Sequence, residues 1–208
     1  MTVLTENKTT FFNRLRHRIA PSELLRVRLA YYMAKFGHRS QVRKETDAEG
    51  RQVRYFEHVR RVAIVVMDQF KIYDPDVIIT ALLHDALEDT DAIDAQMIEH
   101  AFGTEVARNV LNLTKVPDDF SNGYLRRLQN APQNAKIVKC ADRIDNLRSL
   151  SQTTKEFQTK QLRETYEKYD SLFAIAFPSE TRFREYYKIF SLTLFEASEE
   201  CGYEYYGD

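Results

Sequence analysis

Apolar residues recur at helical spacing along most of this chain. Between Pro21 and Gly37 they fall at positions i, i+4, i+7, i+8 and i+11, which places them on one face of a helix. Pro21-Ser22 can cap the start of this helix, and Gly37 is a natural C-terminal stop. The spacing therefore predicts an amphipathic helix that buries a stripe made of Leu25, Leu29, Tyr32, Met33 and Phe36.

The same spacing predicts helices through the rest of the chain. Asp74, Asp94 and Thr104 each precede an apolar run, as N-cap residues do, and Gly103 ends the second of these runs. Beyond Pro132 the pattern indicates one long helix. The apolar positions that define these helices are Val59, Val62, Val66 and Phe70; Val77, Ile78, Ala81 and Leu82; Met97, Ile98 and Phe102; Val106, Val110 and Leu111; and Ile137, Ala141, Ile144 and Leu147.

Only one part of the chain favours strands. The polar region from Arg39 to Arg54 contains Asp47-Ala48-Glu49-Gly50, which is typical of a hairpin turn. We expect a loop over residues 115–123 and two helices rich in Tyr and Phe over residues 155–169 and 179–199. The fold class predicted is therefore all-α, a helical bundle with at most a short β-hairpin near residues 43–56.

Length and charge narrow the class of protein. A chain of 208 residues suits one domain, residues 1–208, and its net charge of −1 favours neither nucleic acid nor anionic lipid as a partner. The basic residues between Asn13 and Arg28 are expected to form a solvated helix face. Cys140 and Cys201 have neither zinc nor disulfide spacing, and no apolar run is long enough for a membrane span. We therefore expect a cytoplasmic protein that binds neither nucleic acid nor membrane.

The densest chemical signal lies at residues 82–90. His84, Asp85, Glu88 and Asp89 stand within six positions at the end of an apolar helix. Taken alone, this group fits a solvated helix end as well as a metal site. Two further candidates, His58 and Asp142, would complete a set of two imidazoles and two carboxylates, which suits Mn²⁺, Fe²⁺ or Zn²⁺ if the side chains converge.

The long helix after Pro132 also carries a polar side. Spacings of three, one, three and three residues place five side chains on one stripe of this helix. These side chains are Lys139, Asp142, Arg143, Asn146 and Ser149.

An ordered set of sequence blocks resembles a known family. His58, His84-Asp85 and Asp142 resemble the H...HD...D signature of the HD metal-dependent phosphohydrolase superfamily. The finer match, from about Arg28 to Leu150, is to the hydrolase domain of RelA/SpoT homologues. The blocks that carry it are Gly37-His38-Arg39-Ser40-Gln41-Val42-Arg43-Lys44, Gly50, Tyr55-Phe56-Glu57-His58, Ala81-Leu82-Leu83-His84-Asp85-Ala86-Leu87-Glu88-Asp89-Thr90, Phe102-Gly103, Leu113-Thr114-Lys115 and Lys139-Cys140-Ala141-Asp142-Arg143-Ile144-Asp145-Asn146-Leu147-Arg148.

The resemblance implies an HD-domain helical bundle with a defined activity. Hydrolases of this family remove the 3′-pyrophosphate from ppGpp and pppGpp with Mn²⁺. Carried over by position, the metal ligands are His58, His84, Asp85 and Asp142, and the pair that acts on the attacking water is Glu88 and Asp89. The implied substrate-binding residues are Arg43 and Lys44 near the base, Asn146 and Ser149 in the nucleoside pocket, and Lys139, Arg143 and Arg148 near the product pyrophosphate.

This chain departs from the family at three positions. The family has Pro where this chain has Val59, a small or hydroxyl residue at Glu45, and His at Asp145. None of these changes removes a metal ligand. We expect Glu45 to point to solvent, because a carboxylate in the pocket would repel the substrate's phosphates.

The resemblance leaves the biological setting open. The residues after Leu150 are too few for a synthetase domain, so we expect a stand-alone hydrolase with a helical C-terminal extension, residues 151–208. Its partners are the nucleotide substrate and, in the same pathway, a cognate alarmone synthetase. Aromatic residues near the end, Tyr203, Tyr205 and Tyr206, can dock on the domain or on a second subunit, as in a homo-oligomer. Activity on another nucleotide, such as ppApp or NADPH, and a catalytically inactive regulatory domain are the alternative functions.

Overall fold

The computed structural model describes residues 7–116 and 123–205 of the chain. Most of the loop predicted over residues 115–123 therefore lies outside the described residues. The α-helices are α1 (Lys8–Asn13), α2 (Pro21–Gly37), α3 (Tyr55–Ile64), α4 (Pro75–Leu83), α5 (Ala86–Asp89), α6 (Ala95–Phe102), α7 (Thr104–Leu113), α8 (Gly123–Gln129), α9 (Gln133–Arg148), α10 (Lys155–Glu164), α11 (Ser171–Ala176) and α12 (Arg184–Cys201). The other elements are the strands β1 (Val42–Thr46) and β2 (Gln52–Arg54), the π-helical turns η1 (Val65–Gln69) and η3 (Thr165–Asp170), and the 3₁₀ turn η2 (Leu150–Gln152).

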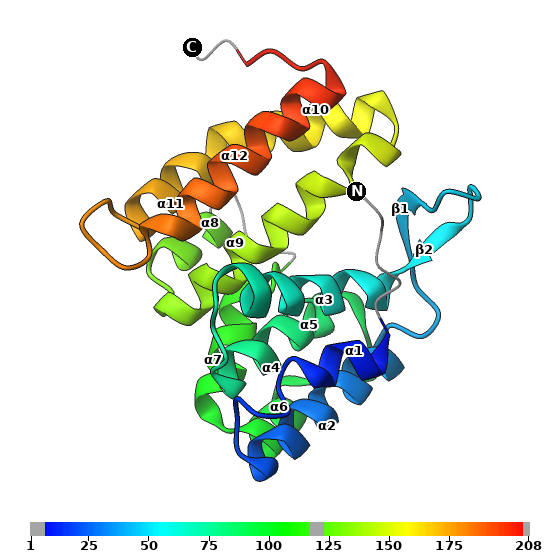
Figure 1. Cartoon of the computed structure of the whole chain (residues 1–208), viewed down its shortest axis with the longest axis vertical. Helices are drawn as coiled ribbons and strands as arrows, with labels where there is room; N and C mark the ends of the chain where they lie inside the picture. The colour runs from blue at the N-terminus through cyan, green and yellow to red at the C-terminus, as the bar shows by residue number, and fades with distance from the viewer. Residues whose placement is uncertain (1–6, 117–122, 206–208) are drawn as a thin grey trace.

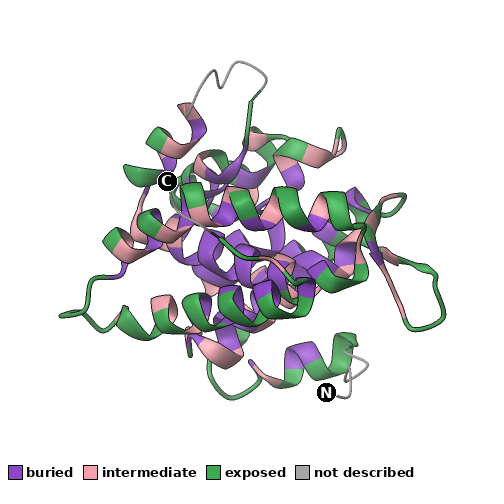
Figure 2. Ribbon diagram, turned by 90° about the horizontal axis from the view of Figure 1, so that it is seen from above, coloured by how far each residue is buried: buried purple, intermediate pink, exposed green. Residues whose placement is uncertain are grey.

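Helix α9 runs through the middle of the bundle (Figure 1). It packs against α3, α4 and α7 on one side and against α12 on the other. Helix α2 covers α4, while α10 and α12 lie against each other above α9. Buried residues gather on these central helices, and the outward faces of the surrounding helices are exposed (Figure 2). The predicted helical bundle is confirmed. Helix α9 contacts both the earlier helices α3, α4 and α7 and the C-terminal helix α12.

The predicted hairpin is confirmed. Strands β1 and β2 are antiparallel, with Val42 opposite Arg54 and Thr46 opposite Gln52. The side chain of Asp47 accepts hydrogen bonds from the backbone N–H groups of Glu49 at 3.0 Å and Arg51 at 2.8 Å. Gly50 adopts φ +76°, a conformation that L side chains rarely adopt. The turn chemistry explains why a single short sheet forms here.

Helix boundaries follow the predicted caps, with small corrections. Asp74 and Asp94 accept backbone hydrogen bonds from the first turns of α4 and α6, as predicted. Thr104 is the first residue of α7 rather than its cap, and its hydroxyl donates to Glu99 at 2.9 Å. Helix α2 begins at Pro21, so Ser22 lies inside the helix. The last helix begins at Arg184 rather than near Ser179, because residues 179–183 form turns.

The predicted buried face of α2 is wrong. Helix α2 forms as predicted, but its buried residues are Val27, Ala30, Tyr31, Ala34 and Gly37. Three of these residues are small, and at Gly37 the approach is close, since a Cβ there would lie 2.9 Å from Ile93 Cδ1. Four residues of the predicted stripe are instead exposed: Leu25, Leu29, Tyr32 and Phe36.

The C-terminal residues fold back onto the domain. The rings of Tyr166 and Tyr205 stack with centroids 4.5 Å apart, and the Tyr203 ring lies 6.3 Å from Tyr166. Tyr206 lies outside the described residues. Of the two docking modes expected for the aromatic tail, these two tyrosines show docking on the domain itself.

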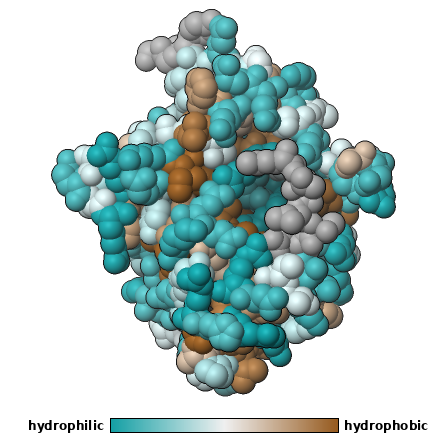
Figure 3. All heavy atoms as spheres, in the orientation of Figure 1, coloured by the Kyte–Doolittle hydropathy of each residue, from teal (hydrophilic) through white to brown (hydrophobic). Residues whose placement is uncertain are grey.

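The face of the molecule seen in Figure 1 is mostly hydrophilic. Hydrophobic residues interrupt it in the upper part, where α12 crosses (Figure 3). On that helix Leu192 and Phe195 are exposed. Within the described residues, no helix combines the length and the apolar character that crossing a membrane requires.

Candidate metal centre and nucleotide cavity

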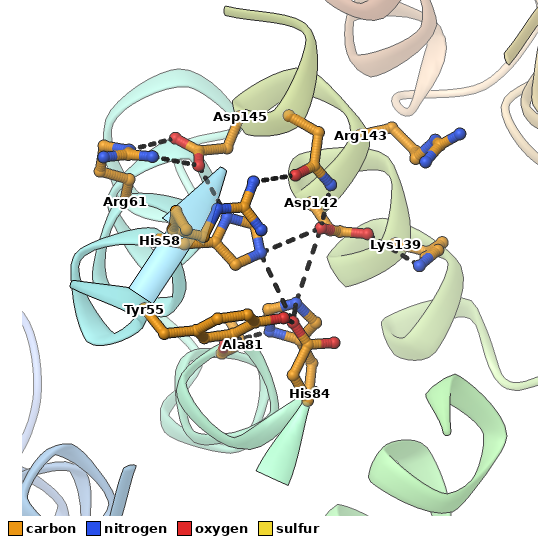
Figure 4. A network of polar contacts seen from close by, with 12 residues as sticks. Tyr55, His58, Arg61, Ala81, His84, Lys139, Asp142, Arg143 and Asp145 are labelled. Carbon is orange, nitrogen blue, oxygen red and sulfur yellow. Dashed lines mark hydrogen bonds and ion pairs between the residues drawn. The ribbon is translucent and has the colours of Figure 1, made fainter. Parts of the chain in front are cut away.

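Four buried or half-buried side chains converge between α3, α9 and the turn that follows α4; three of them, His58, His84 and Asp142, are labelled in Figure 4. His58 comes from α3, His84 and Asp85 follow α4, and Asp142 lies on α9. His58 Nε2 lies 3.2 Å from Asp142 Oδ1 and 3.6 Å from Asp85 Oδ2. His84 Nε2 lies 3.1 Å from Asp85 Oδ2 and 3.6 Å from Asp142 Oδ1. Residues that are far apart in the sequence thus bring two nitrogens and two oxygens to one point.

Both imidazoles are oriented by a hydrogen bond on the opposite nitrogen. His58 Nδ1 lies 2.7 Å from Asp145 Oδ2, and His84 Nδ1 lies 2.9 Å from the carbonyl oxygen of Ala81. Because each Nδ1–H can donate to an oxygen, each Nε2 is left with a lone pair. Both Nε2 atoms are buried and have no hydrogen-bond partner among the described residues. This donor set fits a divalent transition ion, which His58, His84, Asp85 and Asp142 would hold.

Electrostatics ties the four groups together. Burial and the charge of Arg43 both disfavour a protonated His58, but the neighbouring carboxylates of Asp142, Asp145 and Asp85 outweigh them and raise the pKa of His58 to about 8. For His84, burial is again outweighed, chiefly by the charge of Asp85, and the pKa rises to about 10. Burial alone would raise the pKa of Asp142, yet Lys139 and the two histidines hold it well below its usual range. A divalent ion held by these groups would therefore compete with protons for the two imidazoles.

Three further residues hold the carboxylates in place. The Tyr55 hydroxyl donates to Asp85 Oδ2 at 2.6 Å. Asn146 Nδ2 donates to Asp142 Oδ1 at 2.7 Å, and Lys139 Nζ lies 2.8 Å from Asp142 Oδ2. Sequence reasoning gave Tyr55 no role, although its position three residues before His58 placed it on the same face of a helix.

A cavity of about 300 Å³ adjoins the metal site. It shares Tyr55 and Asn146 with the groups described above, and Asn146 Oδ1 accepts a hydrogen bond from Arg43. Five of the predicted substrate-binding residues line it: Arg43, Lys44, Arg143, Asn146 and Ser149. Sequence reasoning did not identify the wall contributed by later elements, which includes Phe157, Gln161 and Thr165.

The expectation that Glu45 points to solvent is wrong. Its side chain is 3% exposed and lines the cavity. Glu45 Oε1 accepts a hydrogen bond from Arg61 at 2.6 Å, and Oε2 lies 3.7 Å from Arg43 Nε. The positive charges of Arg61 and Arg43 explain why a carboxylate can be buried here.

Of the basic residues predicted to contact the product, Arg148 lies away from the site. Arg148 is not part of the cavity wall and donates to Gln69 at 2.9 Å, because it projects from a different side of α9. Lys139 is paired with Asp142 beside the metal ligands. Arg143 does reach the cavity, with its guanidinium 4.2 Å from the Tyr169 ring centroid.

Glu88 and Asp89 lie on α5, immediately after the ligands His84 and Asp85. Glu88 Oε2 accepts a hydrogen bond from the backbone N–H of Lys115 at 3.0 Å. Burial raises the pKa of Glu88, and the charge of Asp85 adds to this effect against the opposing Lys115. The backbone carbonyl of Asp89 accepts a hydrogen bond from Gln41. Their action on water stays a prediction.

Comparison with known proteins identifies the family. The model of the HD domain family matches residues 30–175, more than half of the chain. The chain is 36% identical over 140 residues to the guanosine-3′,5′-bis(diphosphate) 3′-pyrophosphohydrolase MESH1 of Drosophila melanogaster, an alignment that covers 64% of this chain and 74% of the relative. It is 39% identical to the human MESH1 over 126 residues, covering 57% of this chain and 66% of the relative.

Longer proteins and a solved structure match as well. The guanosine-3′,5′-bis(diphosphate) 3′-pyrophosphohydrolase of Aquifex aeolicus is 30% identical over 73% of this chain, which spans only 22% of that relative. A solved structure of a metazoan orthologue of SpoT that hydrolyses ppGpp superimposes with a TM-score of 0.67 and 26% identity, covering 85% of this chain and 96% of the other. With its converging His and Asp side chains, this chain belongs to the HD domain family and is a homologue of the MESH1 and SpoT-type proteins.

Proposed function

We propose that this protein is a metal-dependent (p)ppGpp 3′-pyrophosphohydrolase, which releases pyrophosphate and GDP or GTP. The observation that carries the proposal is the convergence of two histidine nitrogens and two carboxylate oxygens beside a cavity of about 300 Å³. The similarity to relatives named for this activity supports the choice of substrate.

The residues of the chain divide the chemical work. A bound divalent ion would supply a water of lowered pKa and offset charge on the phosphoryl oxygens. Glu88, whose pKa is raised by burial, and Asp89 would orient that water and take its proton. Attack of the water oxygen on the phosphorus attached to the 3′-oxygen breaks the bond between them. The proton taken from the water passes on to the ribose oxygen, which leaves as the 3′-hydroxyl of GDP or GTP.

The cavity would hold the nucleoside. Arg43, whose guanidinium lies 5.4 Å from the Tyr55 ring centroid, can stack on a purine from the β1 side. Asn146, which accepts a hydrogen bond from Arg43, and Ser149 line the same cavity at the end of α9. Because Asn146 also donates to the metal ligand Asp142, a nucleoside in this cavity places its 3′-phosphates beside the metal site.

The identity of the ion and the cellular setting belong to the same proposal. Mn²⁺ suits a site with two imidazoles and two carboxylates, and Fe²⁺ and Zn²⁺ are the alternatives to be compared. We also propose that the protein acts in the cytoplasm, as one hydrolase domain, on alarmone made by a separate synthetase.

A nucleotide panel tests the proposal. The metal-free protein is reloaded with Mn²⁺ and incubated with ppGpp, pppGpp, ppApp or NADPH, and the products are resolved by ion-exchange chromatography. We expect ppGpp to yield GDP and pyrophosphate, with no turnover by His84→Ala. Orthophosphate as the first product would contradict the proposed bond cleavage, and preferential turnover of NADPH or ppApp would reassign the substrate.

A further inference from the structure

A series of charged side chains connects the cavity wall to the proposed metal ligand His58. Glu45 accepts a hydrogen bond from Arg61 at 2.6 Å, and Arg61 Nε donates to Asp145 Oδ1 at 2.7 Å. Asp145 Oδ2 in turn lies 2.7 Å from His58 Nδ1 (Figure 4). These consecutive polar contacts join β1, α3 and α9.

We infer that Asp145 is a positioning residue that orients the metal ligand His58, and that Arg61 anchors it. This inference rests on the proposed metal-dependent function. Asp145 and Arg61 lie outside the set of ligands and substrate-binding residues discussed above, and they act on the ion only through His58.

The geometry of Asp145 excludes a ligand role for it. Its Oδ2 accepts from His58 Nδ1 and lies 3.1 Å from Arg61 Nη2, while Oδ1 accepts from Arg61 Nε. Both oxygens therefore face away from His58 Nε2, the nitrogen that lies among the other ligand atoms. A carboxylate on Nδ1–H selects the tautomer with a free Nε2 and holds the ring plane, which raises the affinity for a metal.

Arg61 compensates two buried carboxylates at once. The side chains of Asp145 and Glu45 are 5% and 3% exposed, while that of Arg61 is 32% exposed at the edge of the site. The two-pronged contact with Asp145 fixes the direction of the carboxylate as well as its charge. Removing Arg61 would leave the buried carboxylates of Glu45 and Asp145 without this positive charge, and the Asp145 carboxylate is the one that orients His58.

The inference predicts a graded series of metal affinities. Binding of Mn²⁺ to the metal-free full-length protein is measured by calorimetry for Asp145→Ala, Asp145→Asn, Arg61→Gln and Glu45→Gln. We expect a 10- to 100-fold weaker Kd for Asp145→Ala, the range seen when such supporting groups are removed. Arg61→Gln should weaken binding less than Asp145→Ala, and Glu45→Gln least of all. The double variant Arg61→Gln/Asp145→Ala should bind Mn²⁺ no more weakly than Asp145→Ala, because Arg61 supports His58 only through Asp145.

A matched control separates positioning from general destabilisation. Asp68 forms an ion pair with Arg14 at 2.8 Å and touches neither histidine. Asp68→Asn should lower the melting temperature without changing the Kd for Mn²⁺. The absorption spectrum of the Co²⁺-loaded protein gives a second readout, since a reoriented His58 would alter the ligand field in Asp145→Asn but not in Asp68→Asn.

The outcomes distinguish this inference from the proposed function. Wild-type affinity in Asp145→Ala, or in both Asp145→Asn and Arg61→Gln if the alanine variant does not fold, would overturn the positioning role. Equal weakening in Asp68→Asn would do the same. Tight, Asp145-dependent binding of Mn²⁺ in a protein that does not hydrolyse ppGpp would overturn the proposed substrate only.

Discussion

Glu88 and Asp89 follow the metal ligands by one helical turn and are the residues proposed to act on water. We expect Glu88→Gln and Asp89→Asn each to lower kcat by about 100-fold or more, the scale of general acid–base help, while the bound metal stays nearly unchanged. Steady-state kinetics with ppGpp and elemental analysis of the same samples check this.

The exposed Asp91 provides the control for these two variants. Asp91→Asn should retain wild-type kcat, because the change removes one nearby negative charge without touching the site. Loss of metal in Glu88→Gln would make Glu88 a ligand. An unchanged kcat in either variant would remove that residue from the mechanism.

Glu45 bears on which purine the cavity accepts. Its buried Oε2 has no hydrogen-bond partner among the described residues, so it can accept from the N1–H and N2–H groups of guanine, whereas adenine has an acceptor at N1. We expect wild-type protein to prefer ppGpp over ppApp, and Glu45→Ser to lower the ratio of their kcat/KM values by more than about tenfold. A ratio that stays constant would mean that Glu45 does not face the base.

The raised histidine pKa values predict how stability depends on pH. In the metal-free protein the pKa values of His58 and His84 are about 8 and 10, above the usual 6.5. Their contribution to stability is fully present below pH 6.5 and is lost as the pH rises through 8 and then 10. The melting temperature in EDTA should therefore fall between pH 6.5 and pH 9.

Bound metal should oppose this fall in melting temperature, because the ion competes with protons for the imidazoles of His58 and His84. The increase in melting temperature on adding Mn²⁺ should be larger at pH 9 than at pH 6.5. A variant with His84→Ala should lose most of the pH dependence of that increase, because His84 has the larger rise in pKa. An increase independent of pH would argue against the two histidines as ligands.

At this scale, the proposed metal ligands can be predicted from the sequence, but the side chains that support His58 and Asp85 cannot. His58, His84, Asp85 and Asp142 stand in recognisable sequence blocks, and the structure brings them together. Asp145, Arg61 and Tyr55 act through contacts between residues 30 to 87 positions apart, which no local pattern encodes. Glu45 was placed in solvent because the balancing charge of Arg61 could not be foreseen.

Helix α2 shows what periodicity can and cannot predict about an element. The helix and its end at Gly37 follow from the sequence. Its orientation does not, because three of the five buried residues, Ala30, Ala34 and Gly37, are small and contribute little to a hydrophobic pattern. Leu25, Leu29 and Phe36 lie on the exposed face, so the predicted stripe gave the wrong orientation.

Stability measurements can verify this orientation. Leu29 is 48% exposed, so Leu29→Gln should change the free energy of unfolding by no more than about 0.5 kcal/mol. Val27 is fully buried, and Val27→Ala should cost about 1–3 kcal/mol through lost burial and the cavity that remains. Urea denaturation of both variants gives the comparison. Equal losses would mean that the stripe containing Leu29 is covered in solution.

On the scale of the whole molecule, the C-terminal helices complete the cavity that the earlier elements begin. Phe157 on α10 and Thr165 at the start of η3 line the cavity together with β1, and Lys44 Nζ of β1 lies 4.2 Å from the Phe157 ring centroid. The metal ligands, by contrast, come from α3, α9 and the end of α4. Helices α3 and α9 therefore serve both sites, whereas the C-terminal wall of the cavity carries no proposed metal ligand.

This division predicts a separation of kinetic effects. Phe157→Ala should raise KM for ppGpp several-fold while kcat changes by less than about threefold, because a cavity wall contributes equally to the bound substrate and the transition state. The Kd for Mn²⁺ should not change. Phe195→Ala, at a residue 60% exposed on α12, is the matched control and should leave both constants unchanged. If Phe157→Ala instead lowered kcat in proportion to kcat/KM, the α10 wall would act on the transition state, and the cavity and metal site would have to be treated as one unit.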